Sequence, residues 1–235
     1  MSKFKWVIFA AVTIGILGVL VYLSIGSRLD VSTIDATKIQ SASEQNGNIA
    51  DHVFGKVDSP VVLIEYGDFQ CPGCGSAHPR VKAITEEYKN EMQFVFRNFP
   101  LTSIHPNAKA AAGAVEAAGL QGKYWDMHNK VFETQSEWSL LTSSERTDRF
   151  LSYAMALGLN ADTFSADLAS EAINKKIKFD QAIAAKIGVT STPTFYLNGV
   201  ELGQEIWGDD VALKAAIDSE LQKAGIDAPQ AAKTE

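Results

Sequence analysis

The two cysteines of the chain, Cys71 and Cys74, are separated only by Pro72 and Gly73. The stretch VVLIEY at 61–66 comes just before them and is rich in β-branched and apolar residues, which predicts a buried strand. Pro72 suits the first position of a helix, which we expect to run to about residue 90. The cysteine pair is therefore predicted to lie at a turn from a strand into a helix.

The rest of the chain predicts an α/β domain interrupted by helices. A second strand is expected at 92–99, so strand, helix and strand form a parallel βαβ unit. Apolar spacing and many alanines predict a helical block at 107–170. After it we expect a helix at 171–188, two strands joined in a type I′ hairpin at Asn198-Gly199, with the second strand running to 206, and a closing helix at 209–225.

These elements predict the following division of the chain. The expected parts are a cytoplasmic stub and anchor (1–30), a partly disordered linker (31–50), an α/β domain in two pieces (51–106 and 171–225), an inserted helical domain (107–170) and a tail (226–235).

The N-terminal segment predicts export. Residues 6–25 carry no charge and, as a helix, would be about 30 Å long, enough to cross a bilayer. Lys3 and Lys5 precede them, which keeps the N-terminus in the cytoplasm and places the rest outside. A cleaved signal peptide is the alternative, although the run is longer than a usual signal core. The net charge of −7 gives no support for binding nucleic acid.

The predicted turn gives the two cysteines different roles. Cys71 would cap the helix, where free N–H groups and the helix dipole stabilise a thiolate. Cys74, one turn inside, could close a small ring and expel a mixed-disulfide partner. We therefore expect Cys71 to be the attacking sulfur and Cys74 the resolving one.

Two other uses of the cysteines are weaker. A zinc site needs four ligands, and only His78 lies close in sequence, with His52, His105 and His128 distant. A purely structural disulfide would close a loop too short to stabilise the fold much. We therefore expect no metal and no cofactor other than the redox-active disulfide.

Two further features accompany the cysteines. Glu65 is an ionisable residue inside the predicted apolar strand, where burial would raise its pKa and let it relay a proton to Cys74. Solvent exposure or pairing with a lysine is the alternative. Thr192-Pro193 precedes a predicted strand, and if it faces the cysteines, the backbone of Thr192 could pair with an extended substrate segment.

The sequence resembles the DsbA-type branch of the thioredoxin superfamily, exported bacterial thiol–disulfide oxidoreductases with a helical domain inserted in a thioredoxin fold. The resemblance covers about 50–225 and rests on the phrases VVLIEYGDFQCPGC, AAAGAVEAAGLQGKYWDMHNKVF and GVTSTPTFYLNG. It implies that Cys71 is the nucleophile and Cys74 the resolving cysteine. It further implies that Pro193 is the cis-proline preceded by Thr192, and that Glu65 is the buried acid.

The resemblance implies an enzyme that oxidises exported substrate proteins with free thiols and is reoxidised by an integral-membrane thiol oxidase. The expected location is the bacterial cell membrane, with a single N-terminal span and the catalytic domain outside the cytoplasm, or a secreted or periplasmic form after signal cleavage. Pro72 and Gly73 are expected to tune the redox potential, and strongly oxidising members often carry His where this chain has Gly73. A reductase or isomerase of the same fold is the first alternative, and a zinc- or client-binding module without catalysis is the second.

The remaining rings are expected to be structural. The aromatic residues of the helical block are predicted to form its core: Trp125, Phe132, Trp138 and Phe150. His105 is expected in a loop or cap, and His78 is expected to face solvent or pack on Phe69, without a catalytic role.

Overall fold

The computed structural model describes residue 6 and residues 9–18 and 29–229. Contacts divide the chain into two units, one up to Thr33 and one from Ile34 onward. In the first unit, residues 9–18 are helical. Within the described ranges, no helix is both long and apolar enough to cross a bilayer. The rest of the anchor predicted over 6–25, at residues 7–8 and 19–25, lies outside the described residues.

A mixed sheet forms the centre of the second unit, in the order β1-β3-β2-β4-β5 over the described chain. Its strands are β1 (Val53–Gly55), β2 (Val62–Gly67), β3 (Gln93–Asn98), β4 (Thr194–Leu197) and β5 (Val200–Leu202). The pair β2 and β3 is parallel, as the βαβ prediction requires, and the other neighbours are antiparallel. The buried strand β2 is therefore central, and its carboxyl end leads directly into the cysteine turn.

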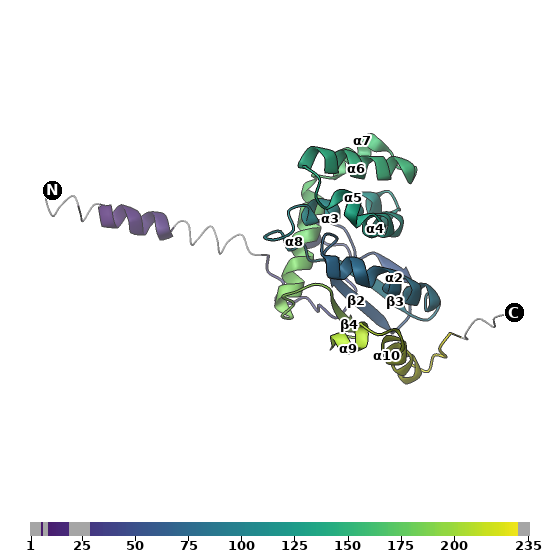
Figure 1. Ribbon diagram of the computed structural model, residues 1–235. Helices are drawn as coiled ribbons and strands as arrows, with labels where there is room; N and C mark the ends of the chain where they lie inside the picture. The colour runs from purple at the N-terminus through teal and green to yellow at the C-terminus, as the bar shows by residue number, and fades with distance from the viewer. Residues whose placement is uncertain (1–5, 7–8, 19–28, 230–235) are drawn as a thin grey trace. The chain divides into compact units, whose positions relative to one another are not determined.

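Helices surround the sheet and form the insertion (Figure 1). Their bounds are η1 (Glu44–Asn46), α2 (Pro72–Glu87), α3 (Ala108–Leu120), α4 (Tyr124–Glu133), α5 (Gln135–Trp138), α6 (Ser143–Ala156), α7 (Ala161–Asp167), α8 (Glu171–Lys186), α9 (Gln204–Trp207) and α10 (Asp210–Lys223). Helices α3 to α7 group together on one side of the sheet, and α8 brings the chain back to it. The fold is thus a thioredoxin-like α/β domain with a helical insertion.

Two sheet details differ from the sequence prediction. The strand β1 was not predicted, because three residues carry too little periodicity to be recognised. The second hairpin strand ends at Leu202 instead of 206, and α9 follows it. The hairpin turn itself has positive φ at both central residues, 48° at Asn198 and 83° at Gly199, which agrees with the predicted type I′ turn.

The aromatic residues of the insertion are mostly core residues. Phe132, Trp138 and Phe150 are buried, and the Trp138 indole donates to the carbonyl of Val131 at 2.9 Å. Trp125 is half-buried and packs its ring against Phe94 and Phe54. The core prediction is therefore confirmed for three of the four and in part for Trp125.

The linker prediction was wrong from residue 34 onward. This arm, residues 34–51, contains the short helix η1, and Asn46 within it is fully buried. The Arg97 guanidinium on β3 donates to the backbone carbonyls of Ala36 and Lys38 and so holds the arm against the sheet. The polar composition suggested a free tether, but these polar groups satisfy one another inside the fold. Of the predicted tail, residues 230–235 lie outside the described residues.

A buried ionic cluster joins the arm to both pieces of the domain. Arg97 on β3 and Lys176 on α8 both bind Asp51 at 2.8 Å, and Lys176 also binds Asp180 at 2.7 Å. The four side chains are almost completely shielded from solvent. Two cations and two carboxylates balance in charge, so removing one partner would leave a buried charge without compensation.

We predict that Lys176→Ala lowers the free energy of unfolding by about 3–5 kcal/mol, because Asp51 and Asp180 lose their shared cation. Denaturant titration at neutral pH measures the loss. The matched control is Lys175→Ala, which removes a neighbouring exposed lysine paired with Glu171 and should change stability by less than about 0.5 kcal/mol. Equal stability of the two variants would contradict a structural role for the cluster.

Candidate active site

The cysteine turn follows the carboxyl end of β2 and begins α2. Cys71 is the N-cap residue, with extended φ and ψ of −68° and 123°, and Pro72 takes the first helical position as predicted. The Cys71 N–H donates to the carbonyl of Asp68 at 3.0 Å, which closes the turn. Cys71 is 8% exposed and Cys74 is fully buried. The outer sulfur, that of Cys71, therefore keeps slight exposure, and the inner one is fully shielded.

The two thiols have opposite electrostatic environments. Both cysteines are free. A hydrogen bond from the Cys74 thiol lowers the pKa of Cys71 to about 5, and contacts with Thr192 and the backbone N–H groups of Cys74 and Gly73 add to this effect against burial. Burial raises the pKa of Cys74 well above its usual value. At neutral pH the outer sulfur is therefore a thiolate and the inner one a thiol.

The Thr192-Pro193 segment faces the outer sulfur. The peptide bond between these residues is cis, and the Cys71 Sγ lies 3.5 Å from the carbonyl oxygen of Thr192. Gly73 lies on the same side: a Cβ there would be 3.4 Å from Pro193 Cδ and 3.6 Å from Cys71 Sγ. The structure thus brings the predicted residues around Cys71 together, with room for a small side chain at position 73.

Glu65 lies behind the cysteines on β2. Its register neighbours are Phe96 on β3 and Phe195 on β4, so its side chain is 4% exposed in apolar surroundings. Burial, followed by the charge of Cys71, raises the pKa of Glu65 to about 8. After burial and the hydrogen bond with Cys71, its charge also contributes to the raised pKa of Cys74. Glu65 is therefore a buried acid and not the exposed or lysine-paired residue of the alternative.

Asp68 is a site residue that sequence reasoning missed. Its backbone N–H donates to Cys74 Sγ at 3.5 Å, and its carboxylate accepts from the N–H groups of Gln70 and Leu101. His105 Nδ1 lies 2.7 Å from the same carboxylate, so His105 is anchored beside the cysteine turn. Only the position of Asp68 just after a buried strand could have marked it.

The insertion contributes polar contacts that the sequence did not reveal. Gln135 of α5 donates to the backbone carbonyls of Phe69 and Cys71. Gln70 donates to the carbonyl of Ser139 and accepts from the N–H of Asn107. Contacts between residues so distant in the chain leave no local pattern in the sequence.

An open groove lies next to the cysteine turn, between that turn and the insertion. Its volume is about 710 Å³, and Pro72, Gln70 and Gln135 are among its lining residues. Two exposed apolar side chains, Ile104 (67%) and Leu140 (95%), also line it. The groove therefore presents exposed apolar surface next to the cysteine turn.

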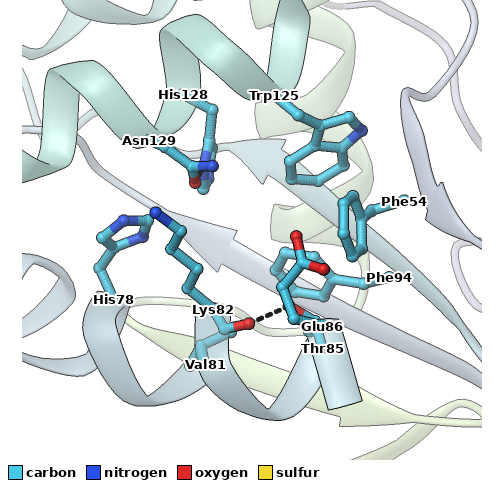
Figure 2. Close-up of a pocket in the computed structure, with 10 residues that line it drawn as sticks. All are labelled: Phe54, His78, Val81, Lys82, Thr85, Glu86, Phe94, Trp125, His128 and Asn129. Atoms are coloured by element: carbon cyan, nitrogen blue, oxygen red, sulfur yellow. Dashed lines mark hydrogen bonds between the residues drawn. The ribbon is translucent and has the colours of Figure 1, made fainter. Parts of the chain in front are cut away.

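A small pocket behind α2 contains two histidines (Figure 2). His78 and His128 are buried, and the Nε2 atom of each has no hydrogen-bond partner among the described residues. Burial lowers the pKa of His78 to about 4 and that of His128 to about 3, so both are neutral at pH 7. The cavity volume of about 20 Å³ fits one water molecule.

The environment of His78 differs from its prediction. Its ring is buried and stacks on the ring of Phe132, with 4.9 Å between the ring centroids, instead of facing solvent or packing on Phe69.

Among the described residues, no group of three or more His, Cys, Asp or Glu side chains could hold a metal ion. The expectation that the site needs no metal or cofactor stays a prediction.

We predict that the Cys71 thiol titrates near pH 5, because Cys74 and the start of α2 stabilise its thiolate. Ultraviolet absorbance of the thiolate in Cys74→Ser, which keeps a hydroxyl donor and leaves a single thiol, measures the midpoint. In Cys74→Ala the donor is absent, and the midpoint should move upward. A midpoint near 8.5 in both variants, the value of a free thiol, would contradict this electrostatic account.

Comparisons with solved structures identify related folds. BdbD from Bacillus subtilis in its oxidised form is 23% identical, with a TM-score of 0.64, and the match covers 78% of this chain and 97% of that one. The α-DsbA1 protein from Wolbachia pipientis is 26% identical, with a TM-score of 0.65 and coverage of 74% and 92%. The fold and its helical insertion are therefore those of DsbA-like proteins.

Sequence comparisons give relatives of a different kind. Na(+)/H(+) antiporter NhaA 1 from Salinispora arenicola is 41% identical over 149 residues, which are 63% of this chain and 22% of the relative. The protein of the same name from Mycolicibacterium vanbaalenii is 37% identical over 154 residues, 64% of this chain and 24% of the relative. The chain thus spans under a quarter of the length of these relatives.

The family model described as thioredoxin matches residues 47–219, and the chain belongs to the thioredoxin family.

Proposed function

We propose that the chain is a thiol–disulfide oxidoreductase that oxidises substrate dithiols through a Cys71–Cys74 disulfide. The observation that carries the proposal is the opposed pair of sulfurs. Cys71 is partly accessible, with its pKa lowered to about 5, and Cys74 is buried, with its pKa raised. Such a pair makes one sulfur a good leaving group and keeps the other protonated until it is needed.

The reaction begins from the disulfide form. A substrate thiolate bonds to the Cys71 sulfur, the bond between Cys71 and Cys74 breaks, and Cys74 takes the electron pair and then a proton. A second thiolate on the same substrate bonds to the first substrate sulfur, and Cys71 leaves as a thiolate. The substrate is oxidised to a disulfide and the enzyme is reduced to the dithiol. A membrane thiol oxidase would restore the enzyme disulfide.

Glu65 is the proposed source of the proton for Cys74. It is protonated at pH 7 because its pKa is about 8, and it is buried, with its charge acting on Cys74. Donation leaves a carboxylate in apolar surroundings, which favours its return to the protonated form. The Thr192 carbonyl, next to the Cys71 sulfur, marks where an extended substrate segment would lie.

The comparisons support this chemistry and a location at a membrane. Wolbachia α-DsbA1 is similar over most of its length, and its name denotes a DsbA protein. The relatives named as antiporters are membrane transporters by that name, and this chain matches less than a quarter of each. The names of these relatives favour a location at a membrane. Work outside the cytoplasm and tethering through the segment 6–25 are proposed from its charge-free run, which as a helix would be long enough to cross a bilayer.

The direction of electron flow depends on how stable the Cys71 thiolate is. A stabilised thiolate favours the reduced enzyme and makes its disulfide a stronger oxidant. The lowered pKa of Cys71 favours the oxidase over the reductase or isomerase. Gly73 provides no side chain near the sulfur, so the Cys74 thiol, Thr192 and the backbone N–H groups at the start of α2 supply this stabilisation.

We predict a reduction potential above about −200 mV, measured by equilibration with glutathione; a value near −270 mV would instead indicate a reductase.

Cys71→Ser should oxidise a reduced unfolded substrate no faster than buffer. Cys74→Ser keeps the nucleophile and should accumulate a mixed disulfide with that substrate. Unchanged oxidation by Cys71→Ser would favour the binding module without catalysis.

We predict that Glu65→Gln slows the reduction of the enzyme disulfide by substrate about tenfold to a hundredfold at pH 7. In the disulfide form the charge of Cys71 is absent, but burial still raises the pKa of Glu65. The wild-type advantage depends on protonated Glu65, so it is present below this raised pKa and disappears as pH rises through it. Stopped-flow rates from pH 6 to 9 measure both effects. The exposed residue Glu87, paired with Lys214, provides the control, since Glu87→Gln should leave the profile unchanged. A parallel profile for Glu65→Gln and wild type would exclude the relay.

A further inference from the structure

Gln135, the first residue of α5 in the insertion, holds the backbone of the cysteine turn. Its side-chain amide donates to the carbonyl of Phe69 at 2.7 Å and to that of Cys71 at 2.9 Å. The two N–H groups of one amide therefore bind the carbonyls of the residues before and after Gln70. The same Cys71 carbonyl accepts the N–H of Gly75 at 3.0 Å, the first hydrogen bond of α2.

Gly75 provides the space for this amide. A Cβ at position 75 would lie 2.6 Å from Gln135 Oε1 and 2.9 Å from its Nε2, closer than real contacts allow. The obstructing atoms are the end of a flexible side chain, so the Gln135 amide would move and the backbone of α2 would stay in place. Residue 75 thus offers a way to disturb the two hydrogen bonds while Gln135 is still present.

The insertion also contacts the cysteine turn at Gln70. Gln70 Nε2 donates to the carbonyl of Ser139 at 2.7 Å, and Gln70 Oε1 accepts the N–H of Asn107 at 2.6 Å. Gln135 and Ser139 lie one helical turn apart, so a single segment of the insertion contacts Phe69, Gln70 and Cys71. The position of the cysteine turn is therefore linked to the position of the insertion.

The geometry at Cys71 depends on where this turn lies. The sulfur is stabilised by the Cys74 thiol and by backbone N–H groups of Gly73 and Cys74, all at the start of α2. These interactions require that Cys71 keep its extended N-cap conformation relative to the first turn of the helix. The hydrogen bonds from Gln135 to the carbonyls of Phe69 and Cys71 restrict movement of the backbone at Cys71.

We propose that Gln135 is a positioning residue for thiol–disulfide exchange, through which the inserted helices hold the Cys71 sulfur against the start of α2. It does not contact the sulfur and acts through the backbone of residues 69 and 71. The proposal rests on the function proposed above. It gives the insertion a role, which is to set the reactivity of the Cys71 thiol.

The test compares Gln135→Ala, Gly75→Ala and the double variant in the full chain. The expected result is that each single variant raises the titration midpoint of the Cys71 thiol by about one unit and lowers the equilibrium constant for oxidising glutathione about tenfold, or about 30 mV. The double variant should match the single ones, because the same two hydrogen bonds are lost in each. Denaturant unfolding confirms that all three are folded.

Gln121→Ala is the matched control. Gln121 is also a glutamine of the insertion with two backbone partners, both on Asn160 and away from the cysteines, so neither readout should change. Reduced stability without a shift in the Cys71 midpoint in Gln135→Ala would overturn the proposal. If the wild-type Cys71 titrates like a free thiol and the protein exchanges no disulfides, the proposed function fails. If the wild type exchanges disulfides and the Gln135 and Gly75 variants behave like it, only this inference fails.

Discussion

The ion pairs of Asp51 with Arg97 and Lys176 close the domain across its insertion. Arg97 belongs to the strand before the inserted helices and Lys176 to the helix after them, so a single carboxylate bridges chain segments that the insertion separates. Burial of such charges is unfavourable unless each has partners on all sides. The requirement fixes α8 and the arm against β3, and this in turn brings β4, with Thr192-Pro193 before it, alongside β2.

The same requirement extends to the end of β3 beside the cysteine turn. Asn98, its last residue, donates to both Asp180 and Glu116 and so connects the cluster to α3 of the insertion. Next to it, the N–H of Phe99 donates to the carbonyl of Gly67, where β2 ends and the turn begins. The reactive sulfur is thus built on a part of the fold that charge pairing and sheet hydrogen bonds hold in place.

Local patterns in the sequence predicted the strand-to-helix turn, the N-cap position of Cys71 and the hairpin at Asn198, because each depends on neighbouring residues. Glu65 was also recognisable, as an ionisable residue in an apolar run. The arm was misjudged because Arg97, a partner far along the chain, binds two of its backbone carbonyls and holds it against the sheet. The contacts of Gln135 and Asp68 escaped for the same physical reason, since hydrogen bonds between distant segments impose no periodicity on either one.

Burial explains how two cysteines of one helix turn acquire opposite chemistry. The Cys71 sulfur lies near the N–H groups of Gly73 and Cys74, and the Cys74 sulfur lies near that of Asp68. Cys74 has also lost its water, and the charge of Glu65 adds to this effect, so the neutral form of Cys74 is favoured. Because Cys74 keeps its proton, its thiol donates a hydrogen bond to the Cys71 sulfur. This hydrogen bond stabilises the Cys71 thiolate. Because residue 73 is a glycine, it provides no side chain that could stabilise the Cys71 thiolate. The reactivity of Cys71 therefore depends on the backbone that presents it, and so on the insertion that holds this backbone.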